Sequence, residues 1–209
     1  MQQNINFNDF CNIWYKVKTA TMGTILRLLG ELSHEETRAM LGKNLSWMDS
    51  VQKIREEITF FIINETNIKN NAASNSVYHN QLFKQYAEIA GAKIDIDFDV
   101  PIESVKDFLR KILAVQPGEI KELLGFYLAT HELSRSVSDK MFEYFRQAET
   151  SEVLLRANEI FEIFRIQHHQ PSFTDLNVNK GDRCVILGHY KTWKERWSEV
   201  LRDLELQPS

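Results

Sequence analysis

The scarcity of helix-breaking residues is the feature that most constrains how this chain can fold. Its 209 residues include only four prolines and eight glycines, and the long stretches between them place apolar side chains three and four positions apart. This spacing puts the apolar groups on one face of an α-helix, whereas a half-buried strand would alternate them at every second residue. Helices without intervening strands pack as a bundle, so the sequence predicts an all-α fold.

The pattern predicts seven or eight helices in a single helical domain that covers residues 1–209. The expected helices cover residues 7–32, a short stretch from about residue 34, a stretch that Ser46 or Asp49 caps and that ends near Asn64, and then residues 76–90, 102–115, 118–147, 152–170 and 190–205. The last of these helices places Tyr190, Trp193 and Trp197 on one stripe, which predicts that these aromatic rings belong to the core.

Local signals predict several of the helix ends. Ser33 followed by Glu36 has the pattern of a capping box, in which each side chain bonds the backbone N–H of the other residue, and it predicts a new helix there. Gly91 is expected to end one helix and Pro117 to begin another. The run 182–188 (DRCVILG) is too short for its periodicity to decide between a strand and a helix.

Composition and charge exclude several classes of protein. The net charge is −4 with both signs interspersed, so the basic footprint of a nucleic-acid-binding protein is missing. No apolar run approaches the ~18 residues that a membrane-spanning helix needs, and MQQNINFNDF at the N-terminus lacks the features of a secretory signal. Cys11 and Cys184 lie far apart in apolar contexts and are expected to be reduced, buried thiols. A cytoplasmic location is therefore expected, with no nucleic-acid or membrane partner.

An alternating acidic segment, Asp95, Asp97 and Asp99, has the beginning of a calcium-binding loop but not its remainder. An EF-hand needs glycine at its sixth position and a bidentate glutamate at its twelfth, and Val100 and Lys106 stand there instead. The segment is therefore expected to be a solvated loop or a short edge strand rather than a calcium site.

Three titratable side chains fall on the apolar faces of their predicted helices. Glu65 continues the stripe that contains Ile62, His79 shares a face with Phe83, and His131 lies near Tyr127. Such a group is costly in a core unless it is paired, hydrogen-bonded or bound to metal, and inward carboxylates and imidazoles build the di-iron sites of helical bundles. A structural interpretation remains open for each of them, because Glu65 lies near a helix end and a single inward histidine is often a hydrogen-bonded core residue.

Two stretches of the chain resemble the haem-oxygenase-like di-metal oxidases. IREEITFFIINET…VYHNQLFKQYAEIAG is similar to the first core segment of that family, in which a helix ends in a glutamate and a histidine opens the next helix, and Glu65 and His79 match these two residues. LLGFYLATHELSRSVSDKMFEYF is similar to the family's central helix, whose glutamate bridges the metals, and Glu132 falls at the match. On the helical wheel His131 points further inward than Glu132, so either this helix is buried on both sides or the match is one residue out.

The last motif of that family, H-x-x-x-D-x-x-H, corresponds to Glu162, Ile166 and His169. The two outer residues are compatible with metal binding, whereas Ile166 stands where the family has its middle carboxylate. The loop between Glu65 and His79 is polar rather than rich in glycine. The resemblance covers about residues 50–170.

The resemblance implies a haem-oxygenase-like bundle that binds iron as Fe²⁺, as one ion or two, and uses dioxygen to oxidise a small organic substrate in its core. Iron with open coordination positions among oxygen and nitrogen ligands suits such chemistry. The implied ligands are Glu65, His79, Glu132, Glu162 and His169, and His131, Asp182 and His189 are held in reserve. Two alternatives remain open: a non-catalytic helical interaction protein or metal-free member of the same fold, and a relative that binds an organic cofactor without metal. The expected partners are the substrate and dioxygen, and a homodimer is the oligomeric state to test.

Overall fold

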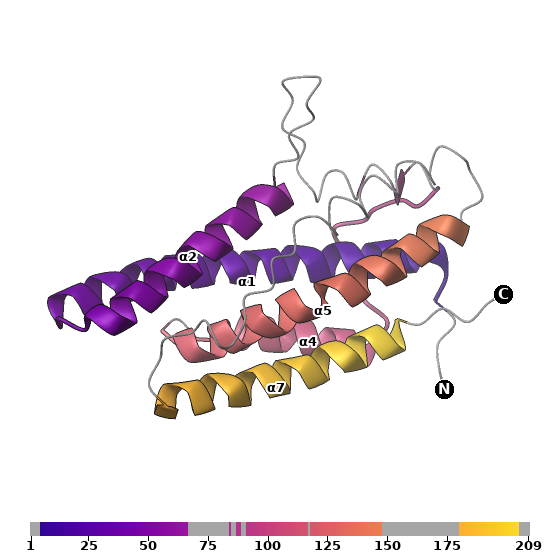
Figure 1. The fold of residues 1–209 in the computed structure, drawn as a ribbon. Helices are drawn as coiled ribbons and strands as arrows, with labels where there is room; N and C mark the ends of the chain where they lie inside the picture. Colours follow the sequence, from indigo (N-terminus) through magenta and orange to yellow (C-terminus); the bar gives the residue numbers. More distant parts are fainter. Residues whose placement is uncertain are drawn as a thin grey trace, which may run out of the picture.

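The described elements of the chain are α-helices that pack as a bundle. The computed structural model describes residues 5–66, 84, 87–88, 91–116, 118–147 and 180–204, except for the side chains of 45–46, 60–66 and 134–147. Within these ranges there are five helices and no strand: α1 (Phe7–Leu41), α2 (Leu45–Thr66), α4 (Glu103–Ala114), α5 (Ile120–Gln147) and α7 (Lys180–Asp203) (Figure 1). The predicted all-α class is confirmed. The helix expected over 152–170 lies outside the described residues.

The helices form two neighbouring pairs and a short connecting helix. α1 and α2 pack as a hairpin, α5 and α7 lie side by side, and α4 contacts both α1 and α7 (Figure 1). α1 also contacts α5, which joins the two pairs. No described helix is both long enough and apolar enough to cross a membrane.

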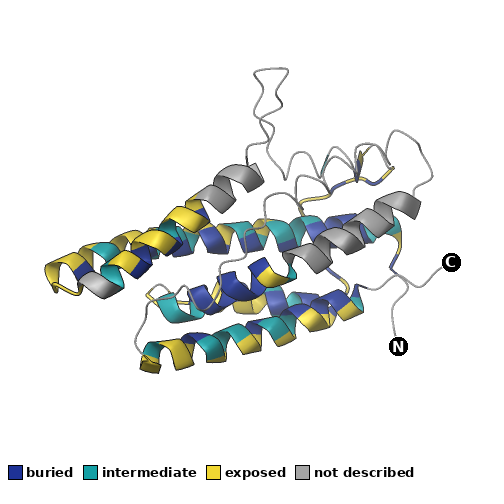
Figure 2. Ribbon diagram, in the orientation of Figure 1, coloured by how far each residue is buried: buried dark blue, intermediate teal, exposed yellow. Residues whose placement is uncertain are grey.

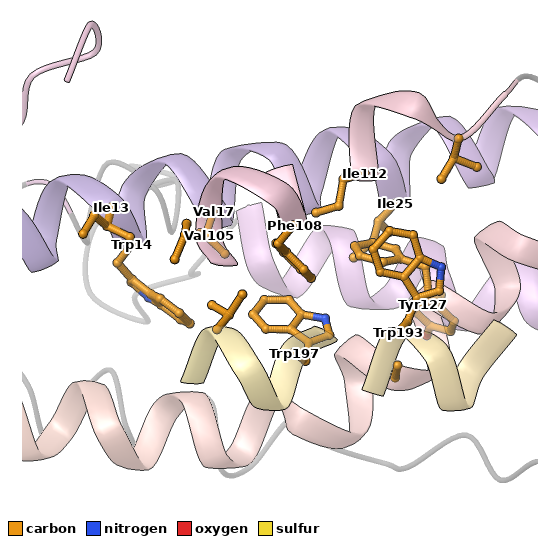
Figure 3. Packing of buried hydrophobic residues seen from close by; sticks show 14 of the residues in the cluster. Ile13, Trp14, Val17, Ile25, Val105, Phe108, Ile112, Tyr127, Trp193 and Trp197 are labelled. Atoms are coloured by element: carbon orange, nitrogen blue, oxygen red, sulfur yellow. The ribbon is translucent and has the colours of Figure 1, made fainter. Parts of the chain in front are cut away.

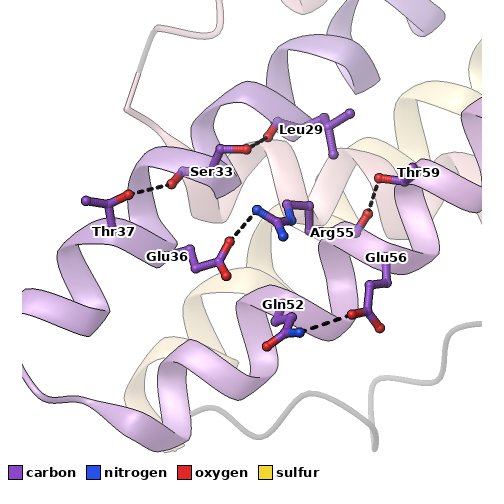
Figure 4. Close-up of polar contacts among 8 residues, drawn as sticks. All are labelled: Leu29, Ser33, Glu36, Thr37, Gln52, Arg55, Glu56 and Thr59. Carbon is purple, nitrogen blue, oxygen red and sulfur yellow. Dashed lines mark hydrogen bonds and ion pairs between the residues drawn. The ribbon is translucent and has the colours of Figure 1, made fainter.

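The first helix is continuous through the break that the sequence predicts at Ser33. The Ser33 hydroxyl donates to the carbonyl of Leu29 at 3.1 Å, and the Thr37 hydroxyl donates to the carbonyl of Ser33 at 3.2 Å (Figure 4). Ser33 is thus a mid-helix residue that bonds back to the preceding turn. Glu36 forms an ion pair with Arg55 of α2 instead of returning to the backbone. The prediction of a separate helix from residue 34 is therefore wrong.

The turn between α1 and α2 is stabilised by backbone and side-chain bonds. The Asn44 N–H donates to Ala39 and the Lys43 N–H donates to Met40, which is a Schellman ending with Lys43 in the left-handed region at φ 56°. The Asn44 side chain then accepts from the N–H of Trp47 at 3.3 Å. Asn44 is therefore the cap of α2, and the prediction that Ser46 or Asp49 caps it is wrong.

Gly91 ends a helical segment as predicted. Residues 84, 87 and 88 are helical, the Ala92 N–H donates to Ala87 at 2.8 Å, and the Gly91 N–H donates to Glu88 at 3.0 Å. Gly91 has a φ of 88°, a conformation that glycine adopts without steric cost.

Two asparagines of α1 hold the loop that follows Gly91. The buried Asn12 side chain donates to the carbonyl of Lys93 at 2.9 Å and accepts from the N–H of Asp95 at 2.6 Å. Asn8 accepts from the N–H of Lys93 at 2.7 Å. The loop is thereby attached to the first helix through its backbone.

The acidic segment of that loop is exposed and satisfies its own polar groups. The Asp95 carboxylate accepts from the N–H of Asp97 at 2.9 Å, and Asp99 lies 3.8 Å from the Lys106 ammonium. It forms neither helix nor strand, which confirms the prediction of a solvated loop.

The C-terminal part of the chain is one helix rather than two elements. α7 includes the run 182–188, so the choice between strand and helix is settled in favour of helix. Ile186 of this run is fully buried, whereas Cys184 is exposed. Both cysteines are free, as expected, and Cys11 is buried. The prediction that Cys184 is buried is wrong, because the side of α7 on which it lies faces solvent.

The core lies between α1, α2, α4, α5 and α7, and it is rich in aromatic rings where α1, α4, α5 and α7 meet. The ring centroids of Phe108 and Trp197 lie 4.5 Å apart, and that of Trp14 of α1 lies 6.5 Å from that of Trp197 (Figure 3). The ring centroids of Phe126 and Trp193 lie 5.0 Å apart. Trp193 and Trp197 are thus core residues, as the aromatic stripe predicts, and Tyr190 is partly buried against the same cluster. The Trp197 indole also donates to Thr130 at 3.0 Å, so its polar atom is satisfied inside the core.

Candidate functional site

His131 and Glu132 are neighbours on α5, and the helical wheel predicts that His131 points further inward than Glu132. His131 is 7% exposed, and its ring centroid lies 6.0 Å from that of Tyr127, one turn earlier. The Glu132 side chain is 41% exposed. The wheel is therefore confirmed: His131 points to the interior and Glu132 to the surface.

The described first part of α5 is buried on every side. All nine positions from Leu123 to His131 are buried (Figure 2). A helix that is apolar all round lies inside its protein rather than on the surface. For Glu132 to match the bridging glutamate, the resemblance needs α5 to be buried on both sides. α5 meets this condition up to His131 but not at Glu132.

Glu132 forms a cluster with two residues of α7. The Tyr190 hydroxyl donates to one carboxylate oxygen, and the Lys194 ammonium lies 2.5 Å from the other. The ammonium is also 3.4 Å from the Tyr190 oxygen. Both oxygens of Glu132 are thus engaged in the contact between α5 and α7.

The contacts in this cluster favour one set of charges. Partial burial raises the pKa of Glu132, but the hydrogen bonds from Lys194 and Tyr190 and the Lys194 charge together lower it below its ordinary value. Burial and the bond to Glu132 raise the pKa of Tyr190. The bonds to Glu132 and Tyr190 raise the pKa of Lys194. At neutral pH the cluster is therefore a carboxylate, a neutral phenol and an ammonium.

A glycine in α5 sets the position of this cluster. A Cβ on Gly125 would lie 2.6 Å from the Cβ of His189 and 2.7 Å from the backbone nitrogen of Tyr190. No side chain fits in that space, so the two helices touch through their backbones at this point. The contacts of Lys121 with Asp182 near the beginning of the helices, and of Thr130 with Trp197 further along, show that α5 and α7 run parallel.

The reserve ligands on α7 have other contacts. The segment that contains Asp182 and His189 is helical, which is the condition for the two to share a face two turns apart. Asp182 forms an ion pair with Lys121 of α5. His189 is half-buried where α7 crosses Gly125.

Tyr127 is a second buried titratable group among the described side chains of α5. Burial, together with the negative charge of Glu57 on α2, raises the pKa of its phenol well above the ordinary value. Tyr127 therefore remains a neutral hydrogen-bond donor over the whole physiological range. Together with His131 it gives this side of α5 a polar character in otherwise apolar surroundings.

The side chains of the remaining predicted ligands are not among those that the structure describes. Glu65 belongs to the last turn of α2, but its side chain is not among the described ones, and His79, Glu162 and His169 lie outside the described residues. Among the side chains that are described, no three of histidine, cysteine, aspartate or glutamate are arranged to hold a metal ion. Models of protein families, curated proteins and solved structures give no match to this chain.

The contacts of Glu132 with Tyr190 and Lys194 are absent from the sequence prediction. Tyr190 and Lys194 are four residues apart and so lie on one side of α7, which is a recognisable pattern. Their common partner is 58 and 62 residues away. No periodicity within either helix gives the pairing between them.

Proposed function

We propose that this chain is a non-haem iron enzyme that uses dioxygen to oxidise a small organic substrate in the interior of the bundle. The proposal rests on the resemblance over about residues 50–170, in which Glu65, His79, Glu162 and His169 match ligand positions. The observation in its favour is that His131, a residue able to ligate iron, is buried on the central helix. We assign His131 the ligand position that the resemblance gives to Glu132.

This assignment favours one iron ion rather than two. A bridging carboxylate offers one oxygen to each metal, whereas a neutral imidazole offers a single nitrogen lone pair. With His131 in that position and Ile166 in place of the middle carboxylate, the ligands for a second ion are missing. A bound Fe²⁺ would supply the dioxygen chemistry, and Tyr127 would supply a neutral hydrogen-bond donor near His131.

A second candidate function is a metal-free helical protein that acts through its interactions. The observation that favours it is the cluster of Glu132 with Tyr190 and Lys194, in which the residue at the family's bridging position serves a contact between α5 and α7. The two candidates differ in iron content, which makes them simple to separate.

The test is the iron content of the full chain and of three variants, each purified after loading with Fe²⁺. Wild type is expected to retain one iron per chain. His79→Ala and His131→Ala should each weaken iron binding by at least about 100-fold, since the loss of a ligand exceeds the effect of losing a residue that merely orients one. Glu132→Gln should retain the iron, because its carboxylate belongs to the surface cluster.

Circular dichroism of the same samples distinguishes loss of the site from loss of the fold. The helical signal should persist in His79→Ala. Two results together would reject the enzyme in favour of the metal-free candidate. Wild type would bind no iron, and His79→Ala would only be less stable by about 1–3 kcal/mol. Iron that is lost in Glu132→Gln and kept in His131→Ala would instead restore Glu132 as the ligand.

A further inference from the structure

We draw no further inference here: the strongest candidate, the exposed and uncharged face of α1 that runs through Thr19, Gly23, Leu26, Gly30, Ser33 and Thr37, is a stripe of mostly small side chains, and nothing in the described part of the chain shows what covers it.

Discussion

The Asn12 amide group makes three hydrogen bonds, and two of them connect α1 to the loop before α4. Its nitrogen donates to the carbonyls of Asn8 and Lys93, and its oxygen accepts from the N–H of Asp95. A buried amide is stable only when its donors and acceptor are used. The same side chain thus satisfies itself and two backbone groups of a segment that has no regular structure to satisfy them.

Asn12→Leu should lower the free energy of unfolding by about 1–3 kcal/mol, because the carbonyl of Lys93 and the N–H of Asp95 lose their partner. Hydrogen exchange should quicken at the Asp95 amide, which is bonded to Asn12. The control is Asn8→Ala, which should cost about 0.5–1.5 kcal/mol and quicken exchange at the Lys93 amide instead. Unchanged protection of the Asp95 amide in Asn12→Leu would refute this role.

The ion pair between Lys194 and Glu132 predicts that the effect of a Lys194 substitution on the free energy of unfolding depends on pH. Lys194→Met should lower the free energy of unfolding by about 0.2–1 kcal/mol at pH 7, as is usual for an exposed pair. The folded-state pKa of Glu132 lies below its ordinary 4.5. Its contribution is therefore fully present above pH 4.5 and is lost as the pH falls through the folded-state pKa.

Urea unfolding of wild type and Lys194→Met between pH 7 and pH 2 measures this difference, which should shrink towards zero below pH 4.5. Lys191→Met removes an exposed lysine of the same helix and serves as the control. A difference for Lys194→Met that stays constant down to pH 2 would show that the lost methylene packing, and not the charge, is responsible.

Single residues show where sequence reasoning about this chain succeeds and fails. The directions of His131 and Glu132 follow from helix geometry alone, because neighbours on a helix point about 100° apart. The exposure of Cys184 could not be predicted from its apolar neighbours, since Ile186 takes the buried position of that turn and leaves Cys184 in solvent. Which side of a helix is covered depends on its partners.

At the scale of the helices, there is a physical reason why the capping-box pattern at Ser33 does not begin a helix. A serine followed three residues later by a glutamate satisfies free N–H groups only where a helix begins. Within a helix those N–H groups are already bonded, and Ser33 turns to the Leu29 carbonyl instead. The buried Leu32 and Ala39 continue the apolar face across the predicted break, and this continuity was the better signal.

Gly125→Ala tests the backbone contact between α5 and α7. The added methyl group would overlap the Cβ of His189 and the backbone of Tyr190, so the helices must separate. We expect a loss of about 1–3 kcal/mol, which is typical of overpacking. The contacts of Tyr190 with Glu132 should weaken as well, since they depend on the same distance between the helices.

Gly188→Ala in α7 is the matched control, because a Cβ there meets nothing within 4 Å. This variant should be more stable than wild type by about 0.5–1 kcal/mol through helix propensity alone. Thermal and urea unfolding of both variants give the comparison. If Gly125→Ala were as stable as Gly188→Ala, the close approach of the two helices would be disproved.

At the scale of the whole molecule, the two cysteines differ in whether their thiols can react while the protein is folded. Cys184 is exposed on α7, whereas Cys11 is completely buried in α1, where burial raises the pKa of its thiol to about 12. The thiolate is the form of cysteine that attacks a thiol reagent, so Cys11 is protected both by its burial and by its protonation. Its reaction requires α1 to leave the core.

Under native conditions one thiol per chain should therefore react rapidly with a soluble thiol reagent. The second should react more slowly by about 10³-fold or more, as expected when only the rare unfolded molecules expose it. Cys184→Ser should abolish the rapid phase and leave the slow one, which urea should accelerate. Rapid reaction of both thiols in the absence of urea would contradict the burial of Cys11.

The Gly42–Asn44 turn has a consequence for the order in which the chain assembles. It joins α1 directly to α2, whereas residues 148–179 separate α5 from α7. Contacts between residues that are further apart in the sequence cost more chain entropy and form later in folding. We therefore expect the α1–α2 hairpin to be an early folding nucleus and the docking of α7 to be the slow step. Synthesis on the ribosome then presents the hairpin long before α7 exists.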